Sequence, residues 1–277
     1  MYHQAKNLHS RIHKLNHLPG WIKREDELSF GISGPKLRKL LPLIEALKNE
    51  KGAVFYGSAY SNFILGAVQL LTENQIDYKL VLKKAHTTKV AGNLSYLLRM
   101  AIPDKILWNG EAFPSNFRII PEGGEVSECV EGAKSLAHSI CNNEEESSVH
   151  FSKVIIDAGT GLSAIGLILG LIELKRDLPV HIFSVKIAED EFFNKLTSYN
   201  IKHPVYFHEL TIHKSFGAVN QRVLAFVDSF AKKEGIFLDP IYGAKVFYEL
   251  SNSAKDLLDE DTLIIHSGGA LSLSGFF

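Results

Sequence analysis

The stretch VIIDAGTGLSAIGL, residues 154–167, carries the clearest fold signal in this chain of 277 residues. An apolar run that reads as a buried strand ends in Gly159, Thr160 and Gly161, and an apolar helix begins near Ser163. Glycines let the backbone approach a ligand closely, and a helix N-terminus offers free N–H groups to an anion. The stretch matches neither the full Rossmann fingerprint nor a P-loop. It therefore predicts a phosphate cradle or, as the alternative, a tight turn without a ligand.

Strand-like and helix-like segments alternate on both sides of this stretch. Such an order is typical of a mostly parallel sheet with helices on both faces. Gly166 and Gly170 favour close packing of the helix rather than a binding site, and the polar stretch 141–150 is the best linker candidate. The expected strands are 21–25, 53–57, 78–84, 105–110, 153–158, 180–185, 205–210 and 262–269, and the expected helices are 36–50, 61–75, 91–101, 132–146, 162–175, 187–199, 219–235 and 246–258.

The bulk composition narrows the class of protein. A net charge of −1 gives no reason to expect nucleic acid or an anionic membrane as a partner. Two cysteines, Cys129 and Cys141, make neither a disulfide framework nor a zinc site, and no metal is expected. The longest apolar run, 162–172, is about half the length that spans a bilayer, and residues 1–17 lack the apolar region of a secretory signal. We expect a cytoplasmic protein of one large or two linked domains.

A second candidate stretch is YGSAYSNFI, residues 56–64. Ser61 and Asn62 fall between a strand end and a helix start, where small polar residues are ordinary caps. The functional alternative places both side chains at the carboxyl end of a parallel sheet, where ligands bind in such folds.

The third candidate, GISGPKLRKL at residues 31–40, places Lys36, Arg38 and Lys39 at a predicted helix N-terminus. The helix dipole disfavours positive charge there. A lysine beside other cations loses proton affinity, and only a neutral amine attacks a carbonyl. The stretch therefore indicates an imine-forming lysine, with solvated surface charges as the alternative.

The fourth candidate combines FLDPIYGAKVFYEL, residues 237–250, with IIHSGG, residues 264–269. Tyr242 stands in a loop-like context before a helix, where it is either a packing residue or an acid or base. Ser267 sits at the end of the last predicted strand.

In this order, these stretches resemble the tryptophan-synthase-like (fold type II) enzymes that use pyridoxal 5′-phosphate. The resemblance is to the branch of 1-aminocyclopropane-1-carboxylate deaminase and D-cysteine desulfhydrase, and it extends from about Trp21 to the last residues. It implies two open, mostly parallel sheets flanked by helices, in a large domain of residues 1–44 plus 149–277 and a small domain of residues 45–148. The matching segments are IKREDELSFGISGPKLRKL, GSAYSN, AGNLSYLL, IPEGG, GTGLSAIGL, LDPIYGAK and HSGGALSL.

The resemblance implies how the chain would hold the cofactor. Lys36 would form the imine with pyridoxal 5′-phosphate, and Asn62 would hydrogen-bond its ring hydroxyl. Ser267 would bond the pyridine nitrogen. The phosphate cradle would consist of Gly159, Thr160, Gly161, Leu162 and Ser163.

It also implies a catalytic set of Lys36, Ser61 and Tyr242. Ser61 would hold the carboxylate of a small amino-acid substrate or assist there, and Tyr242 would act as acid, base or nucleophile. Arg38 and Lys39 would keep the Lys36 amine acidic or assist nearby. The expected reaction converts 1-aminocyclopropane-1-carboxylate to 2-oxobutanoate and ammonia, or D-cysteine to pyruvate, sulfide and ammonia. A homodimer is the expected assembly.

Four positions depart from the pattern of the family. Pro35 replaces an asparagine, Tyr60 a glutamine and Phe216 a tyrosine. Gly243 stands where the deaminases place a glutamate near the pyridine nitrogen, which favours a hydroxyl in that role. These changes leave two alternatives open: a homologue that binds the cofactor without catalysis, as a sensor or carrier, and a binder of phosphorylated metabolites that uses only the glycine loop.

Overall fold

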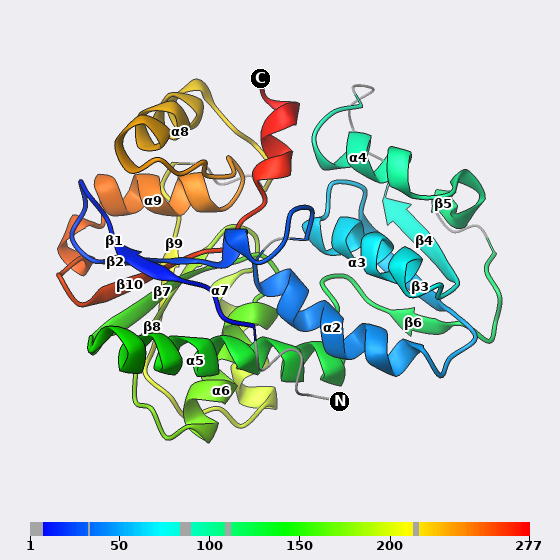
Figure 1. Ribbon diagram of the computed structural model, residues 1–277, viewed down its shortest axis with the longest axis horizontal. Helices are drawn as coiled ribbons and strands as arrows, with labels where there is room; N and C mark the ends of the chain where they lie inside the picture. Colours follow the sequence, from blue (N-terminus) through cyan, green and yellow to red (C-terminus); the bar gives the residue numbers. More distant parts are fainter. Residues whose placement is uncertain (1–7, 33, 84–89, 109–111, 213–215) are drawn as a thin grey trace.

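Two separate sheets organise the chain in the computed structural model, which describes residues 8–32, 34–83, 90–108, 112–212 and 216–277 (Figure 1). One sheet has six strands in the order β1-β2-β10-β7-β8-β9, and the other has four in the order β5-β4-β3-β6. The larger sheet comprises β1 (Ile12–Lys14), β2 (Trp21–Arg24), β7 (Lys153–Ala158), β8 (Val180–Ser184), β9 (Val205–Glu209) and β10 (Thr262–His266). The smaller sheet comprises β3 (Ala53–Ser58), β4 (Tyr78–Lys83), β5 (Ile106–Trp108) and β6 (Arg118–Ile120).

The strand pairing is parallel except at one edge, which confirms the predicted α/β class. β10 pairs in parallel with both β2 and β7, so it joins the beginning of the chain to its middle. Only β1, which pairs with β2, is antiparallel among the described strands. The sequence did not predict β1 and β6, which have three residues each.

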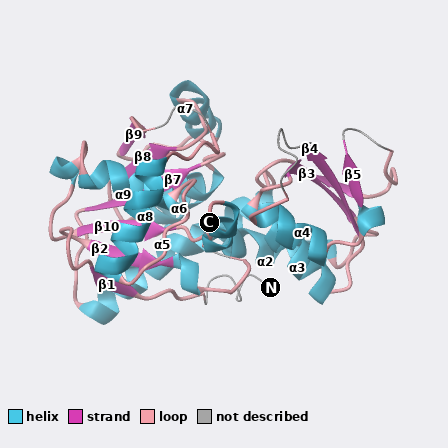
Figure 2. Cartoon of the chain, turned by 90° about the horizontal axis from the view of Figure 1, so that it is seen from above, coloured by secondary structure: helices cyan, strands magenta, loops and turns pink. Residues whose placement is uncertain are grey.

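Helices cover both faces of the larger sheet and pack on the smaller one (Figure 2). α5, α6 and α7 share a core with one face of the large sheet, and α8 and α9 share a core with the other. The helices are α2 (Pro35–Leu47), α3 (Asn62–Glu73), α4 (Asn93–Met100), α5 (Ser127–Ser147), α6 (Leu162–Glu173), α7 (Glu189–Ser198), α8 (Gln221–Glu234) and α9 (Gly243–Ser251). Short 3₁₀ helices are η1 (Glu25–Glu27), η2 (Pro103–Lys105), η3 (Lys255–Leu257) and η4 (Ala270–Gly275).

The two faces of a central strand explain this layering. In β7, Val154 and Ile156 point into the core under α5 and α6, whereas Ile155 points into the core under α8 and α9. A strand that is buried on both faces has a continuous run of apolar residues. This run is why the sequence predicts a strand at the start of the stretch 154–167. The same alternation puts Asp157 on the face of Ile155.

α2 lies between the two sheets, and α5 contributes to both halves of the core (Figures 1 and 2). Cys129 and Val130 of α5 belong to the core of the smaller sheet, and Leu136 and Ile140 to that of the larger. Gly166 packs against α5, because a Cβ atom built on it would lie 2.2 Å from the Cβ of Ala133. The domain boundaries after residues 44 and 148 remain predictions.

The prediction of a linker at residues 141–150 is wrong, because α5 continues through Ser147. Asn143 and Glu144 are polar but buried. Asn143 accepts a hydrogen bond from Lys23, and Glu144 pairs with Arg176 at 2.8 Å. Buried polar groups with partners cannot be told from solvated ones by composition alone.

Among the helices of the described residues, none combines the length and the apolar character that a membrane span requires.

Candidate functional site

A cavity of about 640 Å³ collects the carboxyl ends of strands from both sheets. Its wall includes Ser58 at the end of β3, Lys83 at the end of β4 and Ala158 at the end of β7. This is where open parallel sheets bind ligands, and the volume suits a small molecule. The structure brings all the predicted site residues to this one cavity: Lys36, Ser61, Asn62, Gly159, Thr160, Gly161, Leu162, Ser163, Tyr242 and Ser267.

The glycine loop forms an open cradle at the start of α6. Gly161 is the N-cap residue with φ of 81°, and no described side chain caps the helix, which leaves its first N–H groups without an internal partner. The loop is also tightly enclosed. A Cβ atom on Gly159 would lie 3.2 Å from the Tyr242 hydroxyl, and one on Gly123 would lie 2.7 Å from Thr160 Oγ1. Free donors in a close-fitting backbone pocket suit a phosphate group.

Lys36 enters the cavity from the first turn of α2. The turn depends on Gly34, which has φ of 63° and packs so closely on β10 that a Cβ atom would lie 1.9 Å from the Ser267 carbonyl oxygen. Lys36 Nζ lies 5.5 Å from the centroid of the Tyr242 ring. Burial, with the nearby carboxylates of Asp157 and Asp239, raises the pKa of the Tyr242 hydroxyl far above its usual value. The tyrosine is therefore a proton donor at neutral pH rather than a phenolate.

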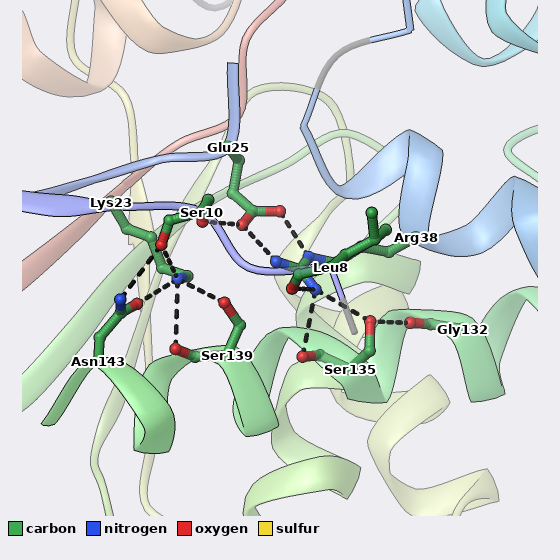
Figure 3. Close-up of polar contacts among 9 residues, drawn as sticks. All are labelled: Leu8, Ser10, Lys23, Glu25, Arg38, Gly132, Ser135, Ser139 and Asn143. Atoms are coloured by element: carbon green, nitrogen blue, oxygen red, sulfur yellow. Dashed lines mark hydrogen bonds and ion pairs between the residues drawn. The ribbon is translucent and has the colours of Figure 1, made fainter. Parts of the chain in front are cut away.

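Arg38 does not reach the cavity, so the expectation that it assists beside Lys36 is wrong. Its Nε and Nη2 atoms each donate to the Glu25 carboxylate at 2.7 Å, and its Nη1 atom donates to Ser135 of α5 (Figure 3). Both side chains are fully buried. The backbone carbonyl of Glu25 also accepts from the Gly34 N–H at 3.0 Å. Glu25 therefore holds the turn of Lys36 on both sides, through the backbone before it and a side chain after it.

Lys39 also lines the cavity wall, one helical turn after Lys36. Its Nζ donates to the Gly123 carbonyl at 2.9 Å and lies 5.0 Å from the centroid of the Phe63 ring. Burial, together with the nearby charge of Lys36 and against the opposing effect of Cys129, lowers the pKa of Lys39 to about 8. Because Gly123 packs on Thr160, Lys39 sits beside the glycine cradle.

Ser61 caps α3, as its conservative interpretation predicts. Its Oγ accepts from the N–H groups of Phe63 at 3.2 Å and Ile64 at 3.3 Å. The same residue lines the cavity, so the capping role fixes it at the helix start without removing it from the site.

Asn93, which the sequence did not single out, sets the orientation of Asn62. Its Nδ2 donates to the Tyr60 carbonyl at 3.0 Å and to Asn62 Oδ1 at 2.7 Å. A carbonyl can only accept, so the Asn93 amide has one orientation and Asn62 must present its oxygen to it. The NH₂ group of Asn62 is then left as a donor. Asn93 Oδ1 and the Ser272 hydroxyl are buried in the cavity wall without a hydrogen-bond partner among the described residues.

Ser267 has a partner that the sequence reasoning missed. Its hydroxyl donates to the Asp157 carboxylate, and both residues line the cavity. The sequence analysis treats Asp157 only as part of a strand. A charged residue inside an apolar run is the signal that could have marked it as a candidate site residue. Gly243 offers no side chain here, and Phe216 lies edge-on to Tyr242 with ring centroids 6.0 Å apart.

Glu122 closes one side of the cavity with two ion pairs. It contacts Lys83 Nζ of the smaller sheet at 2.9 Å and Lys186 Nζ, just after β8 of the larger sheet, at 2.6 Å. The ion pair with Lys186 therefore links the two sheets across the cavity.

Comparison with known proteins gives relatives along nearly the whole chain, although no family model matches. A Pyrococcus horikoshii protein with the provisional name 1-aminocyclopropane-1-carboxylate deaminase is 28% identical over 93% of this chain and 85% of its own length. The mitochondrial bifunctional D-cysteine desulfhydrase/1-aminocyclopropane-1-carboxylate deaminase of Arabidopsis thaliana is 26% identical over 96% and 78%. The crystal structure of an ACC deaminase homologue matches with a TM-score of 0.80 and 25% identity, over 97% of this chain and 91% of that chain.

Proposed function

Because this chain belongs to the 1-aminocyclopropane-1-carboxylate deaminase and D-cysteine desulfhydrase branch of the fold type II pyridoxal-phosphate family, we propose that it is a pyridoxal-phosphate-dependent lyase for a small amino acid. The observation that carries the proposal is that Lys36, Tyr242 and the glycine cradle share one enclosed cavity. Each of these groups has a role in such chemistry.

The residues of the cavity fit the cofactor by their donor chemistry. The N–H groups at the start of α6, with the Lys39 ammonium beside them, suit the phosphate dianion. The amide NH₂ that Asn93 leaves on Asn62 suits the ring oxygen, which is an acceptor when ionised. Lys36 supplies the amine for the covalent link to the aldehyde. The cofactor, when bound, supplies an electron sink for negative charge at the α-carbon of the substrate.

The protein residues then decide which bond breaks. Ser61 at the start of α3 lies where a substrate carboxylate meets helix N–H groups. In this proposal Lys36 moves a proton at the α-carbon, and the protonated Tyr242 gives one to a leaving group. A buried, protonated tyrosine is a poor nucleophile, which favours release of sulfide from D-cysteine over opening of a cyclopropane ring. Water completes the products as pyruvate, ammonia and sulfide.

The test is titration of purified protein with pyridoxal phosphate, with wild type beside Lys36→Ala. We expect a visible absorption band of the lysine-bound cofactor in wild type and none in the variant. D-cysteine and 1-aminocyclopropane-1-carboxylate are then added separately, and the keto acid is followed. A band in both proteins would exclude Lys36 as the link, and a band without keto acid from any small amino acid would favour the non-catalytic sensor or carrier.

A further inference from the structure

Asp157 and Ser267 form a buried pair in the cavity wall. Asp157 lies near the end of β7 and Ser267 follows β10, and these neighbouring strands are parallel. Asp157 is 8% exposed and Ser267 is 2% exposed. Their contact is a hydrogen bond from the serine hydroxyl to the carboxylate. A buried carboxylate beside a ligand cavity strongly affects the charge of whatever binds there.

The direction of this hydrogen bond limits what Ser267 can offer a ligand. Because the Ser267 hydroxyl donates to Asp157 Oδ1, its proton is committed to that carboxylate. The lone pairs on Ser267 Oγ remain, and these can only accept. A ring nitrogen placed against Ser267 must then bring its own hydrogen to make a bond.

The second buried acid nearby cannot take this role. Asp239 Oδ1 accepts from the N–H groups of Ile241 and Tyr242, and its Oδ2 accepts from that of Gly243 at 2.8 Å. These bonds occupy both oxygens in the turn before α9. Asp157 is therefore the carboxylate left to face the cavity from this side, where Gly243 has no side chain.

We propose that Asp157, acting through Ser267, keeps the pyridine ring nitrogen of the bound cofactor protonated. The inference rests on the proposed function and deepens it, because a protonated ring is the stronger electron acceptor. Asp157 is in this sense a positioning residue that acts through the hydroxyl of Ser267. Asp157 would take the role of the glutamate that the deaminases place at the position of Gly243.

The experiment loads the protein with pyridoxal phosphate labelled with ¹⁵N in the ring and reads the nitrogen chemical shift by NMR. We expect a protonated nitrogen in wild type and an unprotonated one in Asp157→Asn and in Ser267→Ala. Asp177→Asn, which removes an exposed carboxylate, should keep the shift of wild type. In parallel, wild type should bind pyridoxal phosphate about tenfold or more tightly than its 1-deaza analogue, and Asp157→Asn should lose most of that preference.

The outcomes separate this inference from the function on which it rests. An unprotonated nitrogen in wild type that still carries the Lys36-linked absorption band overturns the inference alone. A protonated nitrogen in Asp157→Asn, in protein that folds as wild type does by circular dichroism, also overturns it. Wild type that retains no labelled cofactor overturns the proposed function and this inference together.

Discussion

Lys39 shows why the cluster of cations at residues 36–39 is not redundant. Lys36 and Lys39 share the cavity wall, whereas Arg38 turns away to Glu25. Within one turn of helix, Lys36 and Lys39 therefore face the cavity, and Arg38 anchors the helix to Glu25. The sequence showed the three cations together, but which way each points depends on how α2 packs against α5 and the sheets.

We predict that Lys39→Met weakens binding of pyridoxal phosphate by about 10- to 100-fold, the usual range for losing a charged hydrogen bond. Because the pKa of Lys39 is lowered to about 8, the lysine is charged below that pH and neutral above it. The affinity of the wild-type apoprotein for pyridoxal phosphate should therefore fall as the pH rises through 8. The affinity of the Lys39→Met variant should not change over the same pH range. Equilibrium titration by protein fluorescence measures both.

The matched control is Lys48→Met, which removes an exposed lysine just after the same helix. It should leave the affinity and its pH dependence as in wild type. Equal affinities of Lys39→Met and wild type would show that this lysine has no part in holding the phosphate.

The N-terminal turn of α2 is held by a buried ion pair rather than by its own caps. Gly34 has no side chain to cap the helix. Burial alone would raise the pKa of Glu25, but the charge and hydrogen bonds of Arg38 outweigh it and lower the pKa. A carboxylate with a lowered pKa stabilises the folded state above its unfolded value near 4.5, and this stability is lost as the pH falls.

We predict that Glu25→Gln lowers the free energy of unfolding at neutral pH by about 3–5 kcal/mol, because it leaves the Arg38 charge buried without its partner. Urea denaturation at pH 7 and at acidic pH measures the effect. The loss relative to wild type should shrink as the pH falls, since wild type then loses the same ion pair. Glu45→Gln, which breaks the exposed pair with Lys48, should cost under about 1 kcal/mol, and an equal cost for both variants would contradict the prediction.

The sequence predicted the long helices and buried strands because their apolar period survives in the folded state. It also put Ser61 at the start of a helix and Ser267 at the end of a strand, as the structure has them, since both positions follow from where an element begins or ends. It could not supply Asp157 or Asn93, whose partners come from distant parts of the chain. It took the polar end of α5 for a linker, because burial of Asn143 and Glu144 depends on Lys23 and Arg176.

The two sheets meet at the cavity, so ligand release depends on the contacts that join them. Burial raises the pKa of Glu122, but Lys186 and Lys83 outweigh it and lower the pKa, so the carboxylate is ionised at neutral pH. Its pair with Lys186 crosses between the sheets. Partly exposed pairs of this kind contribute up to about 1 kcal/mol and weaken with salt.

We predict that Glu122→Gln speeds release of bound pyridoxal phosphate by up to about fivefold at low salt, the factor that corresponds to such a pair. The rate is followed by transfer of cofactor to a scavenging apoenzyme. At high salt the two proteins should converge. Glu260→Gln, which breaks the exposed pair with Lys14, serves as the control. A release rate that is the same in Glu122→Gln and wild type at low salt would exclude the pair as a restraint.

The proposed homodimer is tested separately by sedimentation equilibrium.

The position of β10 has a consequence for how the molecule comes into being. This strand lies between β2 and β7, yet it is translated after every other described strand. Contacts between such distant segments close late and slow folding. While the ribosome is still short of Thr262, the nascent chain already carries the turn of Lys36 and the glycine loop, but not the strand that Gly34 packs against. The candidate site is therefore among the last features of the protein to form during synthesis.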